Sequence, residues 1–114
     1  MHLGTKIRIR RKLVLREIAH ARAGDKGDTS NVAVFVYDPA HYPVVKAQLT
    51  AERVKGELSG VVKGSVIRYA VDPLHTLNFV MANALEGGVN ASLNLDGHGK
   101  SWSYLFLALE VEVP

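Results

Sequence analysis

Asn31-Val-Ala-Val-Phe-Val-Tyr37 is the most strand-like stretch of the chain, because it joins β-branched and aromatic residues without a break. Such a short apolar run is typical of a strand that is buried on both faces of a sheet. Asp38-Pro39 follows it with residues that end strands. The stretch therefore predicts a central strand, and the sequence on either side supplies candidate neighbours.

The segment before this strand predicts a second strand and a loop. Ile7 and Ile9 alternate with arginines, and residues 13–20 continue as a strand. Residues 21–30 read Ala-Arg-Ala-Gly-Asp-Lys-Gly-Asp-Thr-Ser, and their glycine and aspartate content predicts a polar loop. We therefore expect a strand, a long loop and then the central strand.

The segment after the central strand predicts a helical layer. Pro43 suits the first turn of a helix that runs to about Leu49, and Thr50 can cap a second helical piece. Residues 65–71 predict a strand, and Asp72-Pro73 would then start another helix.

Apolar residues at helical spacing support that later helix, which Gly87-Gly88 would end. Residues 91–95 could form a short strand, and residues 96–99 a turn. Alternating apolar residues from Leu105 to Val113 predict a last strand. The order strand, strand, helix, strand, helix, strand, strand predicts an α+β fold of two layers, with helices on one face of a mainly antiparallel sheet.

The charge of the chain divides it into an arm and a body. Six of the 14 basic residues precede the first acid, Glu17, which leaves eight basic against 11 acidic residues in the remainder of the 114-residue chain. We therefore expect a basic arm over residues 1–12 and a single domain over residues 13–114. The arm suits an exposed terminus or an edge strand, with contact to nucleic acid or anionic lipid as the alternative. It has no interleaved aromatic residues, so a nucleic-acid partner is not expected.

The absence of cysteine excludes disulfides, thiol nucleophiles and zinc–thiolate sites. It fits a reducing compartment, and no stretch approaches the roughly 18 apolar residues that a membrane span needs. We therefore expect a cytoplasmic protein without a membrane segment, a metal or a cofactor. The serines match no nucleophile motif, so the sequence assigns no reaction.

The polar loop is the main candidate for a ligand site. It gathers groups that could hold an anion, a metal or a proton, and the alternative is a hairpin loop whose aspartates bond their own backbone. The candidate ligand-binding residues of this segment are His20, Arg22, Gly24, Asp25, Lys26, Gly27, Asp28 and Asn31.

Two candidates lie outside the loop. Asn78 would fall on the apolar stripe of the later helix, where a polar side chain needs a partner or a ligand. Lys100 could bind an anion within His98-Gly99-Lys100-Ser101. That stretch is not a phosphate-binding P-loop, because the required first glycine is Asn94 and a strand is expected after it. Trp102 could line a pocket or an interface.

These residues together resemble a known family, the small domain at the C-terminus of acyclic terpene utilisation (AtuA-like) proteins, over residues 14–114. The matching stretches are His20 to Asp28, Tyr42-Pro43, Leu49-Thr50, Arg68-Tyr69, Leu77 to Val80, Ala84 to Gly88, Ser92-Leu93, Asp96 to Lys100 and Glu110 to Pro114. Ala23 and His98 stand where the family pattern has serine and glutamine.

The resemblance implies a ferredoxin-like fold and a link to larger AtuA-type proteins, which act in the breakdown of acyclic terpenes and branched acids as coenzyme A thioesters. It implies no reaction for the small domain. Three hypotheses follow. The first is an accessory subunit of a separate larger chain. The second is a free-standing enzyme or binding domain that takes an anion or an acyl thioester at the Gly24-to-Asn31 loop, and the third is a self-associating homo-oligomer.

Overall fold

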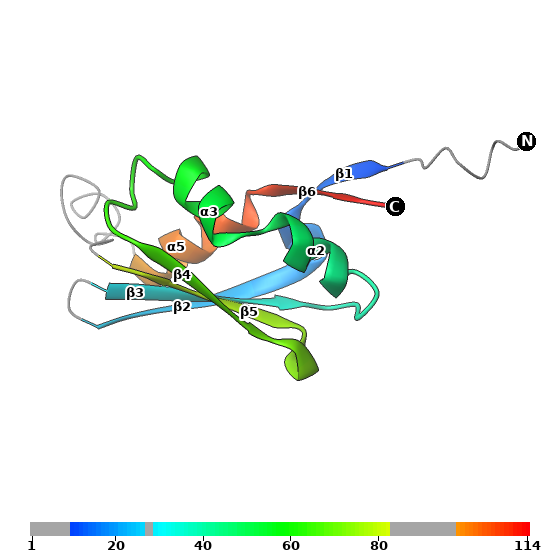
Figure 1. Ribbon diagram of the computed structural model, residues 1–114, viewed down its shortest axis with the longest axis horizontal. Helices are drawn as coiled ribbons and strands as arrows, with labels where there is room; N and C mark the ends of the chain where they lie inside the picture. Colours follow the sequence, from blue (N-terminus) through cyan, green and yellow to red (C-terminus); the bar gives the residue numbers. More distant parts are fainter. Residues whose placement is uncertain (1–9, 27–28, 83–97) are drawn as a thin grey trace, which may run out of the picture.

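The computed structural model describes residues 10–26, 29–82 and 98–114 of the chain (Figure 1). Six strands, three α-helices and two 3-10 turns are assigned in this part. In chain order they are β1 (Arg11–Val14), η1 (Leu15–Glu17), β2 (Ala19–Lys26), β3 (Thr29–Val36), α2 (Tyr42–Gln48), α3 (Ala51–Glu57), β4 (Val66–Val71), η2 (Asp72–Leu74), β5 (Thr76–Met81), α5 (His98–Leu107) and β6 (Glu110–Val113).

Four strands form one antiparallel sheet in the order β2-β3-β5-β4. The helices α2, α3 and α5 lie on one side of this sheet, and none of the described elements lies on the other side (Figure 1). The segment from β3 through α2 and α3 to β4 is a split βαβ unit, because β5 lies between its two strands. The predicted α+β two-layer fold is thus confirmed.

The core lies between this sheet and the helices. Every second residue of β3 is buried, at Val32, Val34 and Val36, whereas the residues between them are only half-buried. In β5, Phe79 is likewise fully buried. The central strand was predicted correctly, but the expectation that both its faces are buried was wrong, because helices cover only one of them.

The helical layer begins as the sequence predicts. Pro43 lies in the first turn of α2, and the Thr50 hydroxyl accepts a hydrogen bond of 3.1 Å from the Arg53 amide at the start of α3. From the sheet, the Arg68 guanidinium donates to the carbonyls of Lys46 (2.6 Å) and Leu49 (2.8 Å). Arg68 thereby satisfies carbonyls at the end of α2 that the helix itself leaves without partners.

The N-terminal expectations were partly wrong. Residues 13–20 are not one strand, since β1 ends at Val14 and a 3-10 turn follows. Residues 21–30 are not a loop either, because β2 continues to Lys26 and β3 begins at Thr29. Pairing with β3 along the whole of β2, and packing of α5 on β2, stabilise a strand that its glycine and alanine content would not favour alone.

The helix expected after Asp72-Pro73 was also wrong. These residues begin only a single 3-10 turn, and β5 follows as a strand. Leu77, Phe79 and Met81 alternate along it and are fully buried. Because β5 lies between β3 and β4, its backbone is paired on both sides, and this pairing outweighs the local helical spacing.

The last expected strand is shorter than predicted, because α5 occupies residues up to Leu107 and only β6 is extended. Trp102 and Phe106 are four residues apart and both fully buried, which is the spacing of one helix face. Trp102 therefore belongs to the core and does not line a surface. The strand expected at residues 91–95, the first half of the expected turn at 96–99, and Ile7 with Ile9 lie outside the described residues.

The strands β1 and β6 form a separate two-stranded antiparallel sheet that extends from one end of the molecule (Figure 1). Arg11 and Lys12, at the end of the basic arm, therefore lie in a strand. In the described residues no helix is both long and apolar enough to cross a membrane.

Candidate functional site

The side of the four-stranded sheet that faces away from the helices is the candidate functional site, and we call it the open face. Strand register places its residues in three rows across β2, β3, β5 and β4. The rows are Gly24, Asn31, Val80 and Ile67; then Arg22, Ala33, Asn78 and Tyr69; then His20, Phe35, Thr76 and Val71.

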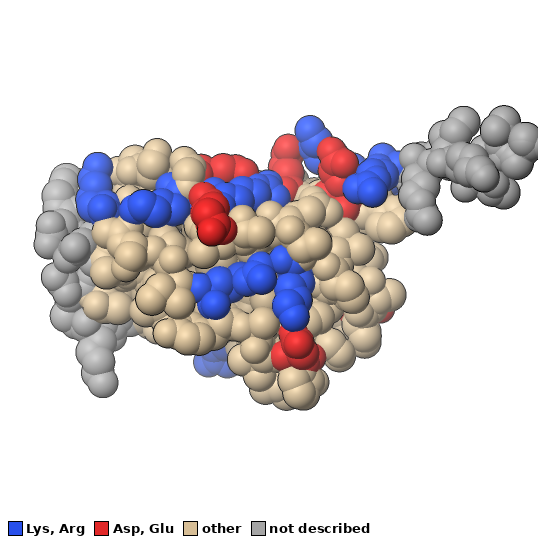
Figure 2. Space-filling view, in the orientation of Figure 1, with Lys and Arg blue, Asp and Glu red and all other residues tan. Residues whose placement is uncertain are grey.

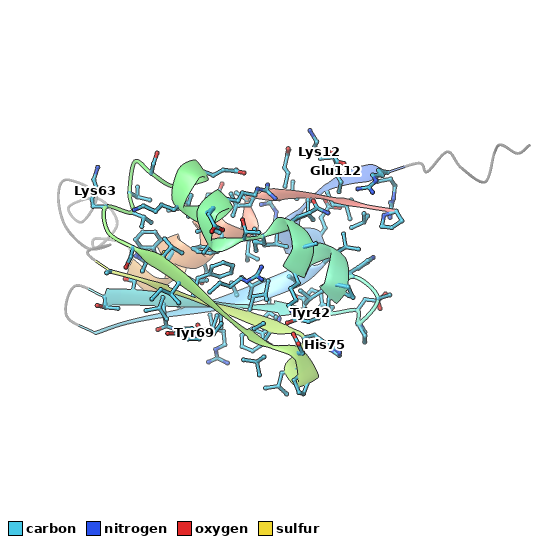
Figure 3. The ribbon with its side chains drawn as sticks, in the orientation of Figure 1. Lys12, Tyr42, Lys63, Tyr69, His75 and Glu112 are labelled. Atoms are coloured by element: carbon cyan, nitrogen blue, oxygen red, sulfur yellow. The ribbon has the colours of Figure 1, made fainter. Side chains whose placement is uncertain are left out.

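The open face exposes apolar and aromatic side chains. On β4, Ile67 and Tyr69 are 47% and 53% exposed, and Tyr37 beyond the end of β3 is 61% exposed. Tyr69 projects from the sheet on the side away from the helices (Figure 3). The three rows contain no acidic residue. Charged side chains lie mostly over the helices and the β1–β6 sheet in Figure 2, and few lie along the lower margin, where the open face is.

Two asparagines join the middle of the open face. The Asn31 Nδ2 group donates a hydrogen bond of 3.2 Å to Asn78 Oδ1, which links β3 to β5 through side chains. A Cβ atom on Gly24 would lie 3.1 Å from Asn31 Oδ1, so glycine leaves the space in which the Asn31 amide sits. Within the described residues, Asn78 Nδ2 has no hydrogen-bond partner, and its donors remain available to a bound group.

The β2 edge of the open face carries its cationic and imidazole groups. The His20 ring stacks on Phe35 at a centroid distance of 4.7 Å and on Tyr37 at 5.4 Å. Arg22 is exposed, and its guanidinium has no hydrogen-bond or ion-pair partner in the described part of the chain. Arg22 is therefore a cation that can meet an outside partner.

The structure brings together five of the ten predicted site residues, which are His20, Arg22, Gly24, Asn31 and Asn78. They share the open face because residues two apart on a strand point to the same side.

The other five predicted residues are not part of this group. Asp25 and Lys26 end β2, and their side chains are not described; Gly27 and Asp28 lie outside the described residues. Lys100 is in the first turn of α5, in the helical layer. A helix and not a strand follows His98-Gly99-Lys100-Ser101, which corrects one ground for rejecting a P-loop. The missing glycine at Asn94 still rejects it.

A cluster of polar side chains at one end of the sheet, Tyr42, Lys46 and Asp72, holds η2 against α2. The Tyr42 hydroxyl donates to Asp72 Oδ1 at 2.6 Å, and the Lys46 ammonium donates to both oxygens of that carboxylate, at 3.0 and 3.2 Å. Burial, followed by the hydrogen bond to Asp72, raises the pKa of Tyr42 to about 12. The hydrogen bonds from Tyr42 and Lys46 lower the pKa of Asp72. These groups satisfy one another, so we assign them a structural role.

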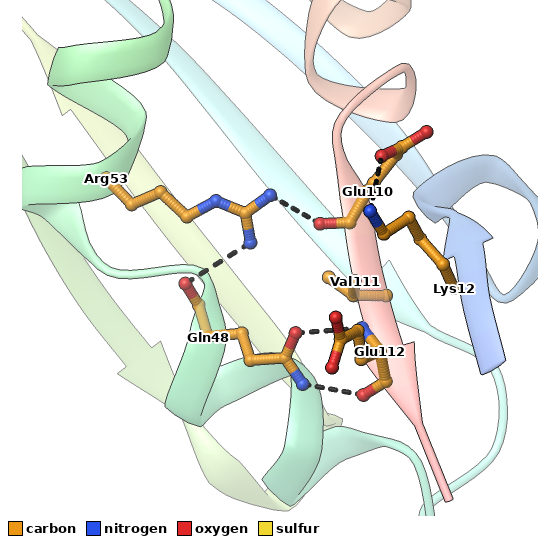
Figure 4. Close-up of a pocket in the computed structure, with 6 residues that line it drawn as sticks. All are labelled: Lys12, Gln48, Arg53, Glu110, Val111 and Glu112. Carbon is orange, nitrogen blue, oxygen red and sulfur yellow. Dashed lines mark hydrogen bonds and ion pairs between the residues drawn. The ribbon is translucent and has the colours of Figure 1, made fainter. Parts of the chain in front are cut away.

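A pocket of about 240 Å³ lies between the helices and β6, and side chains from α2 and α3 bond the β6 backbone there (Figure 4). The Gln48 side-chain amide donates to the Glu112 carbonyl at 2.6 Å and accepts from the Glu112 amide at 2.8 Å. The Arg53 guanidinium donates to the Glu110 carbonyl. These side chains bind the edge of β6 that β1 leaves unpaired, so they protect a strand edge and leave little for a ligand.

Sequence reasoning missed the apolar part of the open face. Ile67, Tyr69 and Val71 alternate along β4, and this alternation was the available signal. It does not say by itself which of the two alternating sets the helices cover. In β4, Arg68 faces the helices and is half-buried, whereas Tyr69 lies on the open face and is exposed.

The comparisons with known proteins agree with this fold. The model of the AtuA ferredoxin-like domain matches residues 13–112. Neither the search of curated proteins nor the search of solved structures finds a match. No group of three or more His, Asp or Glu side chains that could hold a metal occurs among the described residues. The match spans nearly the whole chain, and the protein therefore belongs to the AtuA ferredoxin-like domain family.

Proposed function

We propose that this protein is an accessory interaction domain that assembles with other chains through the open face and has no reaction of its own. The proposed setting is cytoplasmic breakdown of acyclic terpenes and branched acids as coenzyme A thioesters, with a larger AtuA-type chain in the same assembly. The observation that carries the proposal is a four-stranded sheet face that no element of the described chain covers.

The composition of the open face supports an interface. The cores of protein interfaces are enriched in aromatic residues and arginine and depleted in lysine, glutamate and aspartate. The open face presents Tyr69, Phe35 and Arg22, and its three rows contain no acidic residue. Contiguous exposed apolar surface on a small protein commonly marks a binding site.

The polar groups of the open face also suit recognition better than catalysis. Arg22, Asn31 and Asn78 offer hydrogen bonds but include no nucleophile. His20 could act as a general base, but its ring is stacked on Phe35 and Tyr37. Hydrogen-bonding groups within an apolar surface fix the orientation of a partner.

A second candidate function is ligand binding at the same face. In the described part of the chain, Asn78 Nδ2 has no hydrogen-bond partner. Arg22 lies in the same row of the open face, with Ala33 between it and Asn78. The two groups favour an anion or the polar end of an acyl thioester. This candidate requires binding by the protein alone, whereas the interaction domain requires another chain.

Native affinity purification from the source cell, with the molar mass of the eluate measured by light scattering, tests the proposal. We expect an assembly larger than one chain, containing an AtuA-type protein, and its loss on substitution of Arg22→Glu. The matched control is Lys63→Glu, an exposed charge reversal on the helical side of the molecule (Figure 3).

A monomeric eluate from both the wild type and the control would contradict the interaction domain. If a monomer then shows a rise in melting temperature with an acyl-CoA, and Asn78→Ala removes that rise, the ligand-binding candidate takes its place.

A further inference from the structure

The register of the open face assigns one partner to it. Resting on the proposed interaction function, we infer that, when no larger chain occupies the open face, a second copy of this chain packs on it, about a twofold axis that runs parallel to the strands between β3 and β5. In this arrangement β2 of one copy lies opposite β4 of the other, and β3 lies opposite β5. Symmetric pairing through one shared surface is the commonest form of protein dimer.

The middle row is complementary to itself under this symmetry. It reads Arg22, Ala33, Asn78 and Tyr69 from β2 to β4. Each Arg22 guanidinium therefore lies over the exposed Tyr69 ring of the second copy, and a cation over an aromatic face is attractive. Each Ala33 lies opposite Asn78, so a small side chain meets a larger one, and the contact occurs twice.

The row that begins at Gly24 shows the same match of small against large. Gly24 has no side chain and lies opposite Ile67 of the second copy, which is 47% exposed in the single chain. Asn31 lies opposite Val80. The Asn31 amide leans into the space that Gly24 leaves, which lowers the surface there.

The row that begins at His20 pairs an aromatic ring with a smaller group. Phe35 lies opposite Thr76, which is buried in the single chain at 5% exposure, and His20 lies opposite Val71, which is 38% exposed. In all three rows each residue therefore lies opposite a residue of a different type. Interdigitation of this kind is how the inner faces of packed sheets fill the space between them.

A twofold axis perpendicular to the strands is unfavourable. An axis perpendicular to the strands at the middle row would place each residue of that row against its own copy. Arg22 would then face Arg22, and like charges in contact repel. Ala33 would face Ala33, which leaves a gap where the strands cross. The order of residues along the row therefore favours the axis parallel to the strands over the perpendicular one.

The size of the face suits a dimer that dissociates on dilution. Four strands about 4.8 Å apart and about 20 Å long give a footprint of roughly 400 Å² in projection. Standard interfaces bury about 800 Å² of accessible surface per partner, so a face of this footprint lies below that size and favours weak association. The three rows carry no acidic side chain that would attract a strongly basic partner instead.

Sedimentation of the purified protein over a range of concentrations tests the inference, with circular dichroism to confirm that each variant is folded. We expect the wild type and Lys63→Glu to form a dimer. Tyr69→Arg should weaken the dimer about tenfold or more, because it sets a second cation against Arg22 at two equivalent contacts. Adding Arg22→Tyr to Tyr69→Arg should restore it, since every cation again meets a ring.

The double variant Arg22→Tyr/Tyr69→Arg distinguishes the parallel axis from the perpendicular one. Capture of an AtuA-type chain distinguishes the dimer from the proposed interaction function. A dimer that Tyr69→Arg weakens and Arg22→Tyr does not restore would overturn the parallel axis. If Tyr69→Arg left the dimer unchanged, or if the wild type were a monomer at every concentration, a second copy would not be the partner of the open face. If the monomer still captures an AtuA-type chain and Arg22→Glu abolishes the capture, the interaction function stands while this inference fails.

Discussion

The two faces of the four-stranded sheet are built from the same strands and differ in every second residue. The covered face places Val34, Leu77 and Phe79 against the helices, where each is fully buried. The open face places Ala33, Asn78 and Tyr69 at the neighbouring positions, where each keeps contact with solvent. The covered face is therefore the source of folding stability, whereas the open face is free to specify a partner.

The largest expected effect is a substitution in the covered face. Phe79→Ala removes a fully buried ring that lies 5.2 Å from Phe106 between ring centroids. We expect the free energy of unfolding to fall by about 3–5 kcal/mol. Its match on the open face is Tyr69→Ala, for which about 0.5 kcal/mol or less is expected. Urea denaturation at one low protein concentration measures both. Equal losses would show that the open face contributes as much to folding stability as the covered face.

The second effect concerns the hydrogen bonds that join Tyr42 and Lys46 of α2 to Asp72. Tyr42→Phe removes the hydroxyl that donates to Asp72, and we expect a loss of about 1–2 kcal/mol. The folded state raises the pKa of Tyr42 to about 12, so the neutral hydroxyl contributes stability below about pH 10, and this is lost as the pH rises through 12.

The contribution of Asp72 to stability has the opposite dependence on pH. Its pKa is lowered in the folded state, so its contribution is present above about pH 4 and is lost as the pH falls through the folded pKa. Denaturation midpoints measured from acid to alkaline pH should show both losses in the wild type. In Tyr42→Phe the alkaline loss should disappear and the acid loss should shrink. If Tyr42→Phe left the pH profile of stability unchanged, the hydrogen bond between Tyr42 and Asp72 would not contribute to stability.

The third effect tests the polar link within the open face. Asn31→Ala, Asn78→Ala and the double variant form a thermodynamic cycle for the 3.2 Å hydrogen bond. We expect a coupling energy of about 0.5–1.5 kcal/mol from urea denaturation. A coupling near zero would mean that the two amides act separately, and that the open face is less ordered than the covered face at its centre.

The smallest effect tests the space beside that link. Gly24→Ala adds a Cβ atom 3.1 Å from Asn31 Oδ1, so the Asn31 amide must shift by a few tenths of an ångström. We expect stability to change by less than about 1 kcal/mol, since alanine also restricts the unfolded chain. The side-chain amide resonances of Asn31 should move in NMR spectra, and Gly56→Ala, where nothing lies within 4 Å, is the control. A shift in neither variant would show that Gly24 is not needed for space.

Much of the fold could be predicted from local pattern. The α+β class, the central strand near Asn31 to Tyr37, the helix begun by Pro43 and the cap at Thr50 all follow from residues close in sequence. Half of the predicted site residues were found together, although the reason given was wrong. A loop was expected, and a strand with its alternation brings His20, Arg22 and Gly24 to one face.

The errors fall where pairing partners are distant. The segment around Leu77 has apolar residues at both helical and strand spacing, so local pattern could not choose between them. The segment from Ala19 to Lys26 is rich in alanine and glycine, which local propensity does not assign to a strand. Hydrogen bonds to β3 along both strands decided these cases.

The sequence by itself determined the layers of this protein, because the free energy of burying apolar residues depends on which residue types recur at which spacing. Only the tertiary structure decided which face of the sheet the helices cover, and so which residues remain outside. Alternation along a strand defines two sets of side chains without ranking them. Here α2, α3 and α5 pack on the set that contains Phe79, and the set that contains Arg22, Asn78 and Tyr69 is left open.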